Sequence, residues 1–119
     1  MSDELMELAW SAGLYDGEGS TNGYPHPKRR IKVRVRQMHR GVLDRFAAAV
    51  KVGKVFGPHK NGKSPALVYE YSTSTADDAY AALNALWPFL SEQKKLQAIQ
   101  AAENFETPFV DRRGRYARG

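Results

Sequence analysis

The first apolar run of the chain has the spacing of a helix. Leu5, Leu8, Ala12 and Tyr15 fall on one stripe at helical spacing, and no residue between Leu8 and Tyr15 is charged. The pattern predicts a helix over residues 5–16 that is apolar all round and therefore buried on all sides. Gly17 would be its glycine C-cap.

A second stripe on the same helix consists of small residues. Ala9, Gly13 and Gly17 recur every four residues. Gly13 is placed in the helix interior, where glycine costs about 1 kcal/mol relative to alanine. A helix cap explains one glycine but not this one, and the small stripe would let a second backbone approach closely.

Farther along, the apolar period changes from helical to alternating. Residues 30–38 place Ile31, Val33 and Val35 on one face and cationic side chains on the other, which predicts a strand with one buried and one basic face. Gln37 shares the parity of the apolar set and should point inward. The later patterns predict a helix over 41–50, extended chain over 51–57, a turn over 58–65, a strand over 66–74, a helix over 74–87 that Pro88 interrupts, and a helix over 92–105 with Leu96, Ile99 and Phe105 turned inward.

The resulting order is helix, two strands, helix, two strands and helices. It predicts an α+β domain with an antiparallel sheet, helices over one face, and the other face open and basic. The facing of the last strand stays open, because Leu67, Tyr69 and Tyr71 compete with Val68 and Glu70 for the inside.

Composition narrows the class of protein. The 119 residues fit one domain, and 42% hydrophobic residues favour a folded chain. The absence of cysteine excludes disulfides and thiolate zinc sites. No signal peptide or membrane span is recognisable, so we expect a soluble, intracellular (cytoplasmic) protein that does not bind membranes.

Charge is distributed unevenly along the chain. The net charge is +5, and residues 28–40 hold seven of the 18 Lys and Arg residues and no acid. A basic segment of this kind favours a polyanionic partner. Two acids, Asp16 and Glu18, lie before this basic segment, at the end of the first helix. The helix dipole already disfavours negative charge at that end.

Two glycines of the small-residue stripe and the two acids at the end of the first helix belong to one sequence motif. The segment "SAGLYDGEGS" resembles the LAGLIDADG motif of homing endonucleases, with glycine before the second acid. The run "VRVRQ", "VLDRFAAAV" and "VGKVFG" is similar to the second strand, middle helix and third strand of that family. "WPFLSEQKKLQA" resembles its proline-led segment with a lysine. The resemblance covers residues 5–104 and implies an αββαββα domain with a saddle-shaped four-stranded sheet.

The resemblance also implies a metal-dependent site. Glu18 and the carbonyl of Gly17 would hold Mg²⁺, for which oxygen ligands are suited. Gln37 would position solvent, with an ordinary polar strand end as the alternative. Lys94 would act on the phosphate or on water, although Gln93 could occupy the same place, and Asp16 is interpreted as a capping or structural carboxylate.

The same resemblance implies partners. One motif per chain implies a homodimer packed through Ala9, Gly13 and Gly17, which cuts both strands of a near-palindromic duplex DNA site. The implied DNA contacts are Lys28, Arg29, Arg30, Lys32, Arg34, Arg36, His39 and Arg40. Two alternatives on this fold are a non-cleaving DNA-binding regulator and an RNA maturase. The domain would span residues 1–105, and residues 106–119 would form a basic, flexible tail.

Overall fold

The first helix leads into the sheet without a loop. In the computed structural model of the chain, which describes residues 2–107, α1 ends at Glu18 and β1 begins at Gly19. The elements are, in chain order, α1 (Asp3–Glu18), β1 (Gly19–Tyr24), β2 (Arg30–Gln37), α2 (Arg40–Val50), β3 (Lys54–Lys60), β4 (Leu67–Ser72), α3 (Ala76–Leu86), the 3-10 turn η1 (Trp87–Phe89) and α4 (Glu92–Glu106). This is the predicted αββαββα order, with Pro88 in the short turn that separates the last two helices.

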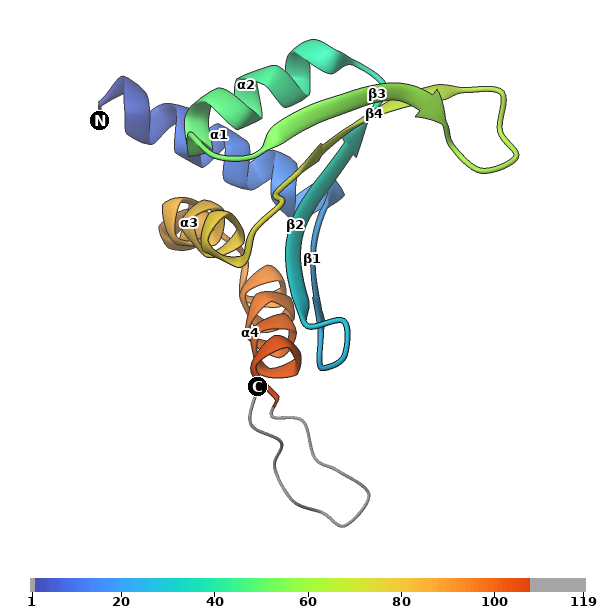
Figure 1. Cartoon of the computed structure of the whole chain (residues 1–119). Helices are drawn as coiled ribbons and strands as arrows, with labels where there is room; N and C mark the ends of the chain where they lie inside the picture. The colour runs from blue at the N-terminus through green and yellow to red at the C-terminus, as the bar shows by residue number, and fades with distance from the viewer. Residues whose placement is uncertain (1, 108–119) are drawn as a thin grey trace.

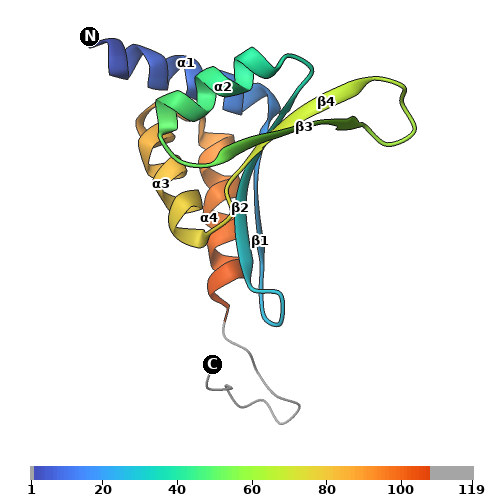
Figure 2. The ribbon, with the colours of Figure 1, turned by 45° about the horizontal axis from the view of Figure 1, so that its top comes forward.

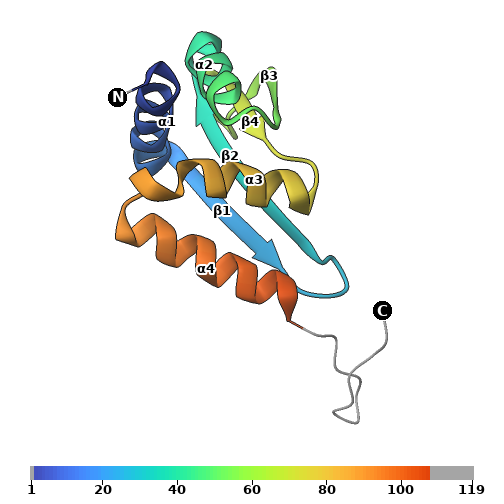
Figure 3. The same ribbon diagram turned by 90° about the vertical axis from the view of Figure 1, so that its left-hand side faces the viewer.

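The strands form one antiparallel sheet in the order β1-β2-β4-β3. All four helices lie against the same face, so the opposite face is open (Figures 1 and 3). The β3–β4 hairpin extends away from the helices, which gives the sheet a strong bend (Figure 2). The predicted α+β architecture is confirmed.

The core lies between the helices and the inner face of the sheet. Val33 and Val35 of β2 are fully buried there, together with Tyr15, Phe46 and Tyr71. The edge of the Phe46 ring packs on Tyr71, with ring centroids 4.8 Å apart. The facing of β4 follows from this packing: Tyr71 points into the core, and its neighbour Glu70 belongs to the open face.

Two expectations about α1 are wrong. The helix runs past residue 16 to Glu18, so Gly17 lies inside it and the cap is Gly19, whose N–H bonds to the Tyr15 carbonyl. The helix is also not buried on all sides, because Gly13 and Gly17 are exposed. Apolar character alone predicted burial, but in the single chain one side of α1 faces outward.

The inward face of α4 differs from the prediction as well. The side chains of Leu96 and Ile99 are 66% and 45% exposed, whereas Ala98 and Ala101 are buried. The reason is the close approach of α4 to β1: a Cβ atom on Gly23 would lie 1.8 Å from the carbonyl oxygen of Ala101. Only small residues fit between the two backbones, so the larger apolar side chains are turned away. Phe105 is half-buried against the core.

Smaller differences concern element boundaries. β3 continues to Lys60, into the predicted turn, and β4 ends at Ser72. The N-cap of α3 is Thr75, whose hydroxyl accepts the Asp78 N–H at 3.1 Å. The N-cap of α4 is Ser91, whose hydroxyl accepts the Lys94 N–H at 3.2 Å. No helix in residues 2–107 combines the length and hydropathy needed to cross a bilayer. The predicted basic tail from residue 108 onward lies outside the described residues.

Candidate functional site

The last residue of α1 carries the acid singled out by the sequence. Glu18 is exposed, and its Oε2 accepts a hydrogen bond from Gln37 Nε2 at 2.7 Å. The Gln37 side chain is fixed at its other end, since its Oε1 accepts the Met38 N–H at 2.8 Å. The structure therefore brings Glu18 and Gln37 together across the junction between α1 and β2.

Lys94 reaches the same end of α1 from α4. Its Nζ donates to the Gly19 carbonyl oxygen at 2.6 Å and lies 5.8 Å from the centre of the Tyr15 ring. Gln93, the alternative for this place, is exposed on α4. The lysine is thus held at the point where the helix passes into β1, one residue from Glu18.

Asp16 has a structural contact. Its Oδ1 accepts the backbone N–H of Ser91, the N-cap of α4, at 3.1 Å. A carboxylate at a helix N-terminus is stabilised by the helix dipole. The negative charge that is unfavourable at the end of α1 is therefore favourable at the start of α4, and the contact ties the two helices together.

The geometry of this corner depends on tight backbone packing. A Cβ atom on Gly19 would lie 2.0 Å from Tyr15 Cδ2, so only glycine lets the chain turn from α1 directly into β1. Tyr15 is fully buried, and its hydroxyl is hydrogen-bonded to Thr21 Oγ1. β1 is an edge strand, and its Thr21 N–H donates to Gln97 Oε1 at 3.2 Å. Glu18 is thus positioned by a tightly packed junction between α1 and β1 and does not belong to a loop.

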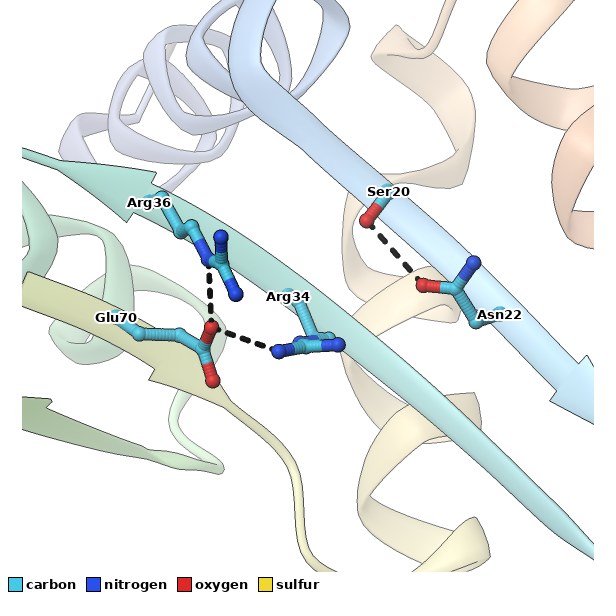
Figure 4. A network of polar contacts seen from close by, with 5 residues as sticks. All are labelled: Ser20, Asn22, Arg34, Arg36 and Glu70. Atoms are coloured by element: carbon cyan, nitrogen blue, oxygen red, sulfur yellow. Dashed lines mark hydrogen bonds and ion pairs between the residues drawn. The ribbon is translucent and has the colours of Figure 1, made fainter. Parts of the chain in front are cut away.

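The open face of the sheet is basic. Register places Arg34 beside Ser20 on β1 and Ser72 on β4, and Arg36 beside Glu70 on β4. The predicted contacts Arg30 and Lys32 share this face, since they alternate with the buried Ile31 and Val33. Figure 4 shows Arg34 and Arg36 reaching the same Glu70 carboxylate, with Ser20 and Asn22 alongside on β1.

The acid and the basic face are continuous. Glu18, Ser20, Arg34 and Arg36 line one open hollow of about 300 Å³. A polyanion lying along the sheet would therefore pass directly beside Glu18.

The remaining predicted contacts lie at the margins. Lys28 and Arg30 line a hollow of about 360 Å³ with Tyr24, at the β1–β2 turn. Arg29 instead lies on the helix side, with its guanidinium 5.1 Å from the centre of the Phe105 ring. His39 and Arg40 begin α2; His39 is exposed, and Arg40 pairs with Asp44 at 3.6 Å.

The small-residue stripe of α1 is largely uncovered in the single chain. Apart from the adjacent residues and backbone of α1 itself, no heavy atom of the described residues lies within 4 Å of a Cβ built on Gly13 or on Gly17, and Ala9 is half-buried. The stripe is therefore not used for packing within the chain.

The oxygen donors at the end of α1 meet only some of the requirements of a divalent cation. Among residues 2–107 no three His, Cys, Asp or Glu side chains gather into one cluster. Glu18 offers a carboxylate at a helix end, where backbone carbonyls such as that of Gly17 also lack helical partners. These are hard oxygen ligands, which Mg²⁺ accepts together with water and substrate oxygens. The donor chemistry fits, but one chain supplies few ligands.

Some residues of this surface were missed by sequence reasoning. Glu70 was placed on neither face, and Ser20, Asn22 and Lys54 were not considered. Their common feature is cross-strand register: Lys54 pairs with Ser72, which pairs with Arg34. β1, with the sequence GSTNGY, lacks the alternation that would have marked its polar side chains as one face.

Comparison with known proteins supports the fold. No protein-family model and no curated protein matches the sequence. The homing endonuclease I-CvuI, solved with its target in the presence of Ca, matches with a TM-score of 0.60 and 21% identity over 87% of this chain and 66% of that chain. I-CvuI solved with an I-CreI target and Mg, with the DNA not cleaved, gives 0.61 and 19% over 87% and 71%.

A third match is more distant. The group I intron-encoded homing endonuclease I-CeuI, complexed with DNA, gives a TM-score of 0.54 and 14% identity over 85% of this chain and 52% of that chain. The chain therefore spans about half to two thirds of the length of these proteins. At these identities the likeness establishes that the chain has the homing-endonuclease fold.

Proposed function

We propose that the protein is a site-specific DNA endonuclease that acts as a homodimer, needs Mg²⁺ and cuts both strands of a near-palindromic duplex site. The observation that carries the proposal is the hollow in which Glu18 adjoins Arg34 and Arg36. A basic surface that can hold DNA and an acidic metal ligand are two components that metal-dependent hydrolysis of DNA requires in one place. Structural neighbours solved with DNA and with Mg or Ca support the choice of substrate and metal.

The open sheet face would bind the duplex. Lys32, Arg34 and Arg36 alternate along β2, and a sheet of this shape fits the major groove. Arginine forks there match guanine edges, whereas Lys28, Arg30, His39 and Arg40 at the margins would neutralise phosphates. Arg29 lies on the helix side and is the least favourable of the predicted contacts.

A second copy of the chain would complete the site. One chain supplies one Glu18, and cutting both strands requires a site for each scissile phosphate. The uncovered stripe of Ala9, Gly13 and Gly17 runs along α1 to Glu18, so packing two copies through it would place two Glu18 carboxylates side by side. Such a two-fold arrangement matches a near-palindromic site.

Each residue at the corner has a distinct part in the proposed reaction. Glu18 and the Gly17 carbonyl would hold Mg²⁺, which when bound polarises the phosphate and lowers the pKa of water. Gln37 already bonds to Glu18, so it can orient both that carboxylate and an attacking water. Lys94 would stabilise charge on the phosphate oxygens, while Asp16 keeps α4 in place to present it.

The proposal is tested by cleavage of a duplex pool with randomised sites in Mg²⁺. We expect double-strand cuts from the native chain and none from Glu18→Gln, which should still bind the selected duplex. The matched control is Glu103→Gln, a change to an exposed glutamate on α4, and it should cut normally. Cleavage that survives in Glu18→Gln would refute the role of Glu18.

A non-cleaving regulator is the second candidate, because Glu18 is the one carboxylate among the residues that line the hollow with Arg34 and Arg36. Binding to one duplex sequence that is indifferent to Mg²⁺, with no nicking, would favour it over the nuclease. Preference for a structured intron RNA over every duplex would instead favour the RNA maturase.

A further inference from the structure

A carboxylate stands in the middle of the cationic sheet face. Glu70 lies on β4 opposite Arg36, and its side chain is only 14% exposed. One of its oxygens, Oε1, accepts both Arg34 Nη2 and Arg36 Nε at 2.9 Å. Figure 4 shows the two guanidinium groups converging on this atom from successive outward positions of β2.

This placement works against binding a polyanion. A negative charge beside two arginines cancels part of their attraction for phosphates and so lowers non-specific affinity. The gain in stability from such pairs is small, because Arg34 and Arg36 are 35% and 56% exposed. Neither affinity nor stability explains why the face contains Glu70.

The hydrogen bonds of Glu70 with the two arginines give a different reason for its presence on this face. A free arginine side chain samples many rotamers and binds any nearby phosphate, whereas a guanidinium held by a carboxylate points in one direction. Arg36 uses Nε for Glu70, which leaves its two terminal NH₂ groups for a ligand. Arg34 uses one of the two hydrogens on Nη2, and the other still forms a donor pair with the N–H beside it, that of Nη1 or of Nε. Each fork retains paired donors of the kind that guanine O6 and N7 accept.

We propose that Glu70 is a specificity-determining residue, which holds Arg34 and Arg36 as guanine-reading forks in the major groove instead of free cations for phosphate. This inference rests on the proposed function of the sheet face. Glu70 acts through the two arginines and is a positioning residue.

The charge state of Glu70 is consistent with this role. Partial burial alone would raise the pKa of its carboxyl group, but the hydrogen bonds from Arg36 and Arg34 outweigh burial and lower the pKa below its usual value. Glu70 is therefore ionised at neutral pH, and the three side chains together carry a net charge of about +1.

Two substitutions separate geometry from charge. Glu70→Asp keeps the charge but shortens the side chain by one methylene, so it cannot hold both guanidinium groups in place. Glu70→Gln keeps the length and removes the charge. Glu92→Gln on α4 is the control for charge, since it also raises the net charge by one and its carboxylate pairs with Lys95 at 3.7 Å, away from Arg34 and Arg36.

Each protein is used to select sites from a randomised duplex pool in Ca²⁺, and its affinity for random duplex is measured at several salt concentrations. The native chain should select guanine at the base pairs facing Arg34 and Arg36. Glu70→Asp should lose about tenfold of that preference, the scale of one bidentate contact, while its affinity for random duplex stays within about twofold. Glu70→Gln should lose the same preference and bind random duplex at least about threefold more tightly, with a steeper salt dependence.

Four results would overturn the inference. Glu70→Asp with an intact guanine preference would show that the clamp does not set base recognition, as would Glu70 variants that behave like Glu92→Gln. Loss of preference accompanied by loss of the folded state in thermal unfolding would assign Glu70 to stability instead. If the native chain binds no duplex at all, the proposed function fails together with this inference, so the two failures are distinguishable.

Discussion

The substitution Gly13→Ala distinguishes a monomer from a homodimer that packs through α1. Gly13 lies in the middle of α1, and in the described part of the chain nothing beyond the neighbouring atoms of α1 comes within 4 Å of a Cβ atom built there. Within one chain the added methyl group meets only solvent. In a homodimer packed through this stripe, it would meet the facing helix, and the two-fold axis would introduce it twice.

Gly13→Ala should stabilise a monomer but destabilise a homodimer packed through this stripe. In an exposed helix interior alanine is about 1 kcal/mol more stable than glycine, so an isolated chain should gain about that amount and melt about 4 °C higher. At a close helix–helix contact, an extra methyl group costs about 1–3 kcal/mol through overpacking. The dissociation constant of the dimer should then rise by roughly 5- to 150-fold.

Thermal unfolding over a wide range of protein concentration, combined with solution mass, distinguishes them. We expect the native chain to melt at higher temperature as its concentration rises, because dimerisation stabilises the folded state. Gly13→Ala should lower the mass at a given concentration. Gly41→Ala is the matched control, since Gly41 lies in α2 and is equally free of neighbours. If Gly13→Ala melts higher at every concentration and keeps the native mass, the stripe is not the interface.

Three further changes follow from contacts at the α4–β1 layer and in the core. Gly23→Ala should cost about 3 kcal/mol or more in the free energy of unfolding by urea, since its Cβ would lie 1.8 Å from the Ala101 carbonyl oxygen; an unchanged midpoint would contradict that packing. Burial raises the pKa of Tyr15 and Tyr71 well above 10, whereas these phenols ionise near pH 10 in the unfolded chain. The unfolded state therefore loses protons first, and the free energy of unfolding should fall by about 1.4 kcal/mol per pH unit for each tyrosine above pH 10; a flat profile from pH 9 to 11.5 in urea titrations would refute this. Lys94→Met should bind duplex but cleave it at least about 100-fold more slowly, and normal single-turnover cleavage would remove Lys94 from the site.

Much of the fold could be predicted from the sequence because its strongest signals are local. The alternation of Ile31, Val33 and Val35 with cations predicted both faces of β2, and helical spacing placed the helices to within a few residues. What failed depended on tertiary contacts. Leu96 and Ile99 have helical spacing, yet α4 presents its alanines to β1, because the close approach at Gly23 leaves no room for larger side chains.

For the candidate site as well, local sequence identified some residues, whereas tertiary contacts could not be predicted. The motif located Glu18, and the lysine block located Lys94 to within one residue, but only the structure shows that Lys94 reaches the end of α1. Pattern could not reveal that Asp16 accepts the backbone N–H of the N-cap residue of α4, since Ser91 is 75 residues away. Glu70 was equally hidden, because its contact with Arg34 and Arg36 depends on the register between β2 and β4.

The central claim is that two copies of the chain meet along α1 and so place two Glu18 carboxylates over one duplex. Because the chain contains no cysteine, Gly13→Cys provides a single thiol, and a disulfide forms only where two Cα atoms come within about 4.4–6.8 Å. Under mild oxidation on a bound duplex, where the duplex and the disulfide hold the pair together against the overpacking of a larger side chain at position 13, we predict a covalent dimer that still cuts DNA in Mg²⁺, and no such product from Gly41→Cys. Failure of Gly13→Cys to cross-link while it binds the duplex, or equal cross-linking by both variants, would contradict the claim.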